Sequence, residues 1–116
     1  MTPETKSISP TGRYMVQIFP WEVRMSHWIE TPQLLDTHTQ QQLIAFEDST
    51  WSLNRADWQS NSVVKLSLRR YPGNHTPSSV EVLVDCEHDR ATVEGTVVEG
   101  LANLEAALER AIGRRQ

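Results

Sequence analysis

Alternating apolar and polar positions run through most of the chain and predict β-strands. In the stretch 63–71 apolar side chains stand at every second position, and the same period of two recurs at 80–86. Weaker versions of this pattern predict four more strands, at 13–23, 25–35, 42–47 and 90–94. Because the connections between these six segments are mostly short, we expect neighbouring strands to pair as antiparallel hairpins.

Turn residues mark where several of these strands begin and end. Pro10-Thr11-Gly12 precedes the first strand, and the polar run at 36–40 is typical of a hairpin turn whose side chains bond their own backbone. Pro20 has no backbone donor, so we expect the first strand to be an edge or to carry a bulge there. The segment 48–58 has the composition of a loop, with one short helical turn at 53–57.

The hydrophobic period changes to that of a helix near the C-terminus. Apolar residues recur three or four positions apart, and alanines between them raise helix propensity: Leu101, Leu104, Leu108, Ile112. Thr96 and Glu99 have the spacing of a capping box, which predicts a helix at about 97–112, with Leu101 as an alternative start. We expect its apolar stripe to pack on the sheet.

Together these patterns predict an α+β fold. A chain of 116 residues fits one domain and is long enough to bury a core without disulfides. The expectation is a flexible leader at 1–8 and a single domain at 9–116. In that domain one twisted, blade-like antiparallel sheet of about six strands, within 13–95, packs on one C-terminal helix.

Part of the chain resembles a known repeat. "SPTGRYMVQI" at 9–18 is similar to the first strand of the TolB-type β-propeller blade, and "LLDTHTQQQLIAF" at 34–46 resembles a later hairpin of such a blade. "ADWQSNSVVKLSL" at 56–68 looks like a second, degenerate copy. The resemblance covers about residues 9–68 and implies a blade-like antiparallel sheet. It implies no inherited activity, because a closed propeller needs at least ~4 blades.

Charge and composition narrow the class of protein. The net charge of −4, from 11 basic and 15 acidic residues, disfavours a nucleic-acid partner. No apolar run approaches the ~20 residues that span a bilayer, so no membrane partner is expected. The N-terminal residues have no basic stretch followed by an apolar core, and Cys86 is the single cysteine. Both features favour a reducing cytoplasm, and we expect a small bacterial-type cytoplasmic protein.

The residues with reactive or metal-binding side chains predict no catalytic site, metal or cofactor. Cys86 and His88 lie two apart, but zinc needs three or four converging ligands, and the other histidines are scattered: His27, His38, His75. Cys86 continues an apolar stripe between two acidic neighbours, which is typical of an inert core thiol. The series Asp85, Glu87 and Asp89 falls at a turn, where such residues bond locally. The chain has neither a glycine-rich phosphate loop nor a nucleophile elbow.

Tryptophan is the most informative residue type in the sequence. The chain has four: Trp21, Trp28, Trp51, Trp58. They fill the core, cover a second sheet face, or form a contact surface, since tryptophan is enriched in both cores and interfaces. We predict an interaction surface made of Trp21, Arg24, His27 and Trp28.

This surface predicts a non-catalytic protein that acts by protein–protein contact. An adaptor or an immunity-like protein is one concrete form, and a homodimer is another way to use the same surface. The acidic charge suits a basic target. The alternative is a small-molecule-binding domain, or a weak enzyme, that uses a Trp/His/Arg cluster.

Overall fold

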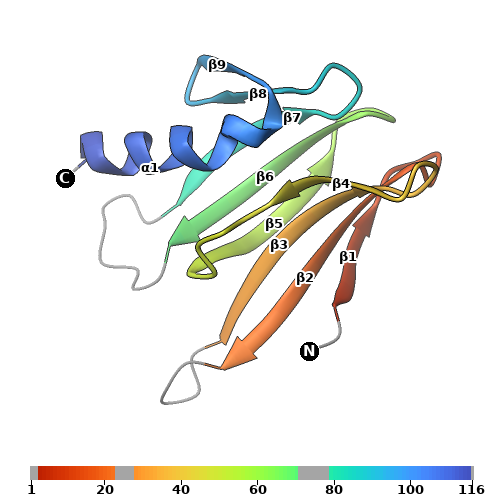
Figure 1. Ribbon diagram of the computed structural model, residues 1–116, viewed down its shortest axis with the longest axis horizontal. Helices are drawn as coiled ribbons and strands as arrows, with labels where there is room; N and C mark the ends of the chain where they lie inside the picture. The colour runs from red at the N-terminus through yellow and green to blue at the C-terminus, as the bar shows by residue number, and fades with distance from the viewer. Residues whose placement is uncertain (1–2, 23–27, 71–78, 116) are drawn as a thin grey trace.

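The protein folds into two antiparallel sheets and one C-terminal helix (Figure 1). The structure is a computed structural model that describes residues 3–22, 28–70 and 79–115. The first sheet has the strand order β1-β2-β3-β4, with bounds Glu4–Ile8, Tyr14–Glu22, Trp28–Asp36 and Gln41–Ala45. The second has the order β5-β6-β7-β8-β9, with bounds Trp51–Trp58, Val63–Arg70, Val80–Asp85, Arg90–Val93 and Thr96–Glu99.

A short 3-10 helix, η1 (Leu101–Asn103), leads directly into α1 (Leu104–Arg115). The apolar stripe of this helical segment is buried, as the sequence predicts. Leu104 and Leu108 are fully buried, and Leu101 and Ile112 are nearly so. The helix contacts β7 and β8, whereas β5 contacts β3 of the first sheet. The inner faces of both sheets and the helix therefore share one continuous core, with Val16, Leu34, Trp51, Leu66, Val82 and Leu108 among its members.

The prediction of a single six-stranded sheet is wrong. All six predicted strands are present, as β2, β3, β4, β6, β7 and β8, but they belong to two sheets. After β4 the chain crosses at 46–50 to the second sheet, where Trp51 and Leu53 are buried in the shared core. Stacking two sheets buries the apolar face of each. The alternation reveals which face is apolar, but not which strands share a sheet.

Two strands lie in segments predicted as irregular. Residues 4–8, expected in a flexible leader, form the edge strand β1, whose side chains are mostly exposed and polar and so leave no hydrophobic alternation. Residues 51–58, expected as a loop with a helical turn, form β5. A register shift against β6 between Leu53 and Arg55 interrupts the period of two at that point.

The helix also begins later than the capping-box spacing indicates. Thr96 and Glu99 belong to β9, which pairs with β8 across a tight turn. Glu94 and Gly95 both have positive φ (48° and 84°), as a two-residue type I′ hairpin requires. Gly100 follows with φ of 85° and separates β9 from η1, so the alternative start at Leu101 is the closer one.

Pro20 does not break the first predicted strand. It pairs with Glu30 in an unbroken register that continues to Glu22. On its other side β2 is paired with β1 only as far as Ile18. Among the residues that the structure describes, β2 therefore has a neighbour on one side only at Pro20, and a missing donor is tolerated there.

Candidate functional site: a groove between β4 and α1

The open edge of β4 is one wall of the candidate site. Within the described part of the chain β4 is the last strand of its sheet and pairs only with β3. Its other edge faces η1 and α1, and β4 contacts η1 directly. An edge strand carries a row of backbone N–H and C=O groups without ladder partners, so this wall offers main-chain hydrogen bonds.

The exposed side of the helical segment is the opposite wall. Ala102 and Ala106 are exposed and small, and Glu105 and Glu109 alternate with them on the same side. Together with the run 42–47 they enclose a groove of about 560 Å³, with Leu101 at its base. This volume lies within the range of ~300–1,000 Å³ that is usual for binding clefts. The alanines leave the space that larger side chains would fill.

Glu105 closes one end of the groove. Its Oε1 accepts the backbone N–H of Glu47, and its Oε2 accepts that of Asp48, both at 2.9 Å. One carboxylate thus holds the start of the β4–β5 connection against the helix. This geometry sets the distance between the two walls at that end.

Removing this clamp is the first testable change. We expect Glu105→Ala to lower the free energy of unfolding by about 1 kcal/mol, because two backbone donors lose a partly exposed acceptor. Urea denaturation measures it. Glu81→Ala, on the exposed face of the second sheet, is the matched control and should change stability by less than about 0.5 kcal/mol. Equal losses in the two variants would show that these two hydrogen bonds of Glu105 do not contribute to the free energy of unfolding.

Glu109, one turn further along α1 than Glu105, joins the helix to the second sheet. Its Oε1 accepts the indole N–H of Trp51 at 3.2 Å, and its other oxygen pairs with Arg70. Arg70 also pairs with Asp48 at 2.8 Å. The helical wall of the groove is therefore held in place by polar contacts as well as by packing in the core.

At its other end the groove continues into a polar pocket of about 460 Å³. The two cavities share Gln42, Leu43 and Ala102. The polar pocket is lined by Arg13, Asp36, Glu87 and Asp89, among others. A long segment in the groove would thus end beside charged side chains.

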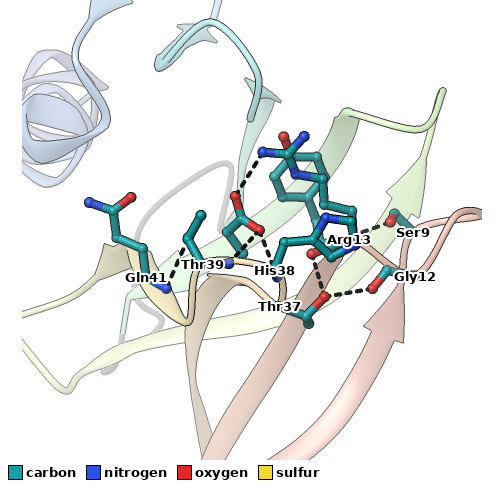
Figure 2. Close-up of polar contacts among 9 residues, drawn as sticks. Ser9, Gly12, Arg13, Thr37, His38, Thr39 and Gln41 are labelled. Carbon is teal, nitrogen blue, oxygen red and sulfur yellow. Dashed lines mark hydrogen bonds and ion pairs between the residues drawn. The ribbon is translucent and has the colours of Figure 1, made fainter.

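Two turns meet at this pocket, and Figure 2 shows the polar contacts between them. Thr37 in the β3–β4 turn donates its hydroxyl to the carbonyl oxygens of Gly12 and Arg13, at 2.8 Å each. The Ser9 hydroxyl accepts the N–H of Tyr14 at 3.0 Å. Gly12 adopts a φ of 80°, which favours glycine in this turn. The two turns are therefore locked side by side, and the predicted hairpin turn at 36–40 is confirmed.

Asp36 and Arg13 form the charged core of the pocket. Arg13 Nη2 lies 3.2 Å from Asp36 Oδ2, and its guanidinium lies 5.2 Å from the centre of the Tyr14 ring. Asp36 Oδ1 accepts the N–H groups of His38 (3.0 Å) and Thr39 (3.4 Å). Burial alone would raise the pKa of Asp36, but the hydrogen bonds from Arg13 and these two N–H groups hold it below its ordinary value.

The predicted interaction surface lies elsewhere. Arg24 and His27 fall outside the described residues. Trp28 is 55% exposed, whereas Trp21 is half-buried and donates its indole N–H to the hydroxyl of Thr31 at 3.1 Å. Trp21 of β2 lies opposite Ile29 of β3, and Trp28 lies opposite Glu22, which is the next residue along β2. Paired residues share a face of the sheet and successive residues alternate between faces, so the two rings project from opposite faces. The structure does not bring these tryptophans together.

Trp21 instead borders a second, apolar hollow of about 530 Å³ on the outer face of the first sheet. Phe19, Thr31 and Ser49 line it with Trp21. Trp21 lies seven residues along β2 from Tyr14, or about 24 Å. The hollow and the polar pocket are therefore separate features at opposite ends of the sheet.

Cys86 and its acidic neighbours have structural roles. Burial, with the charge of Asp85, raises the pKa of the Cys86 thiol to about 12, so the thiol stays protonated in the core. Asp85 accepts from the ring of His88 at 2.9 Å, and Asp89 accepts the N–H of Leu101 at 3.1 Å. Over residues 3–22, 28–70 and 79–115, no three His, Cys, Asp or Glu side chains are placed to hold a metal ion.

Sequence reasoning missed the groove. Its helical wall had a visible signal, since Ala102 and Ala106 lie with Glu105 and Glu109 on the side opposite the buried leucines. Its other wall did not, because alternation in a strand does not say which strand ends a sheet.

Comparisons of the chain with protein-family models, with curated proteins and with solved structures give no match. The resemblance to a TolB-type blade therefore stays a prediction. In the part of the chain that the structure describes, no helix is long and apolar enough to cross a bilayer.

Proposed function

We propose that the protein is a non-catalytic binding protein that takes an extended segment of a protein partner into the groove between β4 and α1. An adaptor or immunity-like role in a bacterial-type cytoplasm fits this activity. The observation that carries the proposal is the open edge of β4, which faces the exposed side of the helix across a groove of about 560 Å³.

Strand addition is the mode of recognition that this geometry favours. A segment added at the usual spacing of about 4.8 Å from β4 would gain main-chain hydrogen bonds, and its alternate side chains would meet the helix. β4 has five residues, so the added segment needs a similar length. Affinity would then come from the backbone, and specificity from the side chains that reach the two walls.

The apolar hollow beside Trp21 supports a second candidate function. Phe19 and Trp21 supply aromatic surface there, and the Thr31 and Ser49 side chains supply polar groups. A small apolar ligand with one or two polar groups fits this chemistry. Such a ligand should raise the melting temperature of the wild type. Trp21→Ala should abolish its binding, whereas substitutions in the groove should leave its binding unchanged.

Filling the groove tests the main proposal. Ten-residue peptides would be selected on the folded protein from a displayed random library and measured by fluorescence anisotropy. We expect Ala106→Trp to weaken their binding by at least about tenfold, because the indole occupies the space beside β4. Ala106 is exposed, so the fold should tolerate the change.

The matched control places the same side chain on the other side of the helix. Arg110 faces β9 rather than β4, and Arg110→Trp should leave peptide binding within about twofold of the wild type. Failure to select any peptide, or binding that survives Ala106→Trp, would refute the groove as the binding site.

A further inference from the structure

The charge around the groove is strongly one-sided. Three glutamates line the groove itself, and three more carboxylates line the polar pocket that continues it: Glu47, Glu105, Glu109, Asp36, Glu87, Asp89. Of the described residues that line either cavity, Arg13 is the one basic residue. An occupant of both cavities therefore meets a negative field.

Some of these charges are already compensated. Arg13 pairs with Asp36, and Arg70 pairs with Glu109. Glu105 accepts only neutral backbone N–H groups, so its full charge remains. Glu87 is exposed and forms neither a hydrogen bond nor an ion pair with the described residues, although its charge interacts with the Arg13 guanidinium in the same pocket. The least compensated charge thus lies along the groove and at its open end.

We propose that the segment bound in the groove is basic, and that a lysine or arginine side chain at its end lies in the polar pocket near Glu87 and Asp89. This inference rests on the proposed function and names its partner class. A side chain with a stem of three or four methylene groups can leave the added strand and reach a carboxylate while the stem covers Leu43. The pocket supplies opposite charge, and the groove supplies the backbone edge.

The same field argues against a second copy of this chain as the occupant. Two copies joined at their β4 edges would bring two acidic grooves together, which costs energy unless cations intervene. An acidic segment would be disfavoured for the same reason. Complementary charge therefore singles out a basic extended segment.

Three peptides of equal length test the inference: ten-residue peptides in which valine alternates with lysine, with serine or with glutamate. At low salt the lysine peptide should bind the wild type at least about tenfold more tightly than the serine peptide, with an advantage that shrinks as salt is raised. The glutamate peptide should bind most weakly. Anisotropy with a fluorescent label measures all three.

Two charge reversals locate the effect. Glu87→Lys should reduce the advantage of the lysine peptide by about threefold or more. Glu81→Lys, an equal change on the exposed face of β7 and outside both cavities, should leave it nearly unchanged. Equal losses in both variants would mean a general charge effect and would overturn the inference.

The outcomes separate the two proposals. If all three peptides bind alike and Ala106→Trp abolishes each, the groove function stands and the basic preference is wrong. If no peptide binds, the groove function itself fails. Sedimentation adds one more result: a concentration-dependent dimer that Ala106→Trp disrupts would identify a second copy as the occupant and contradict a basic partner.

Discussion

Replacing Trp51 by alanine should lower the free energy of unfolding by about 3–5 kcal/mol, the usual range for a large aromatic residue in a core. Trp51 is fully buried, its ring lies against Phe46, and its indole N–H is bonded to Glu109. It belongs to the core that the two sheets and the helix share. The substitution removes the largest fully buried side chain of that core and leaves a cavity.

Chemical denaturation with guanidinium measures this loss, and Trp28→Ala is the matched control. Trp28 is 55% exposed, so its removal should cost less than about 1 kcal/mol. Domains of this size are commonly stable by only ~5–15 kcal/mol, so Trp51→Phe, a milder change, serves if Trp51→Ala does not fold. Equal costs at positions 51 and 28 would contradict the two-sheet core.

Asp36→Asn should lower the free energy of unfolding by about 1.5–3 kcal/mol, the range for hydrogen bonds made by a charged group. Asp36 is 5% exposed, and its carboxylate joins Arg13 of one turn to two backbone N–H groups of the other. The asparagine amide keeps one acceptor oxygen for the backbone N–H groups. Its NH2 group then faces the guanidinium, and two donors cannot form a hydrogen bond with each other. The ion pair between the two turns is then lost, and the hydrogen bonds from Thr37 to Gly12 and Arg13 remain as the link between them.

The same carboxylate predicts a pH dependence. Because the folded-state pKa of Asp36 is lowered, its stabilising contribution is present above the ordinary aspartate value of about 4 and is lost as the pH falls through the lower folded pKa. The wild type should therefore lose more stability on acidification than Asp36→Asn does. Asp48 and Asp85 also have lowered pKa values, so the variant should keep part of the acid sensitivity.

Denaturation at pH 6 and pH 3 compares the two proteins, and Asp57→Asn is a control at an aspartate outside the polar pocket. A wild type and an Asp36→Asn variant that lose equal stability would show that Asp36 is not held ionised by its partners.

Much of the fold was predictable because its strands have one apolar face. The six segments with strong or weak alternation all form strands, and the helical leucine stripe is buried as expected. The three missed strands each lack the pattern for a physical reason. β1 is a polar edge, a bulge interrupts β5, and β9 is a four-residue strand beside a tight turn.

The candidate site was less predictable because it depends on which elements become neighbours. Tryptophans stand out in a sequence, yet Trp51 proved to be core and Trp21 is bonded to Thr31 within its own sheet. The groove is made instead by an open strand edge and by alanines, which attract no notice as a binding motif. Only the stacking of the two sheets places β4 opposite α1.

Amide hydrogen exchange of β4 with and without the lysine–valine peptide tests the central claim most directly. If the peptide adds as a strand, the backbone N–H groups within 41–46 that point away from β3 should exchange more slowly in the complex, and those of β1 should not change. Protection confined to Phe19, Trp21 and Thr31, or no change along β4, would contradict strand addition in the groove.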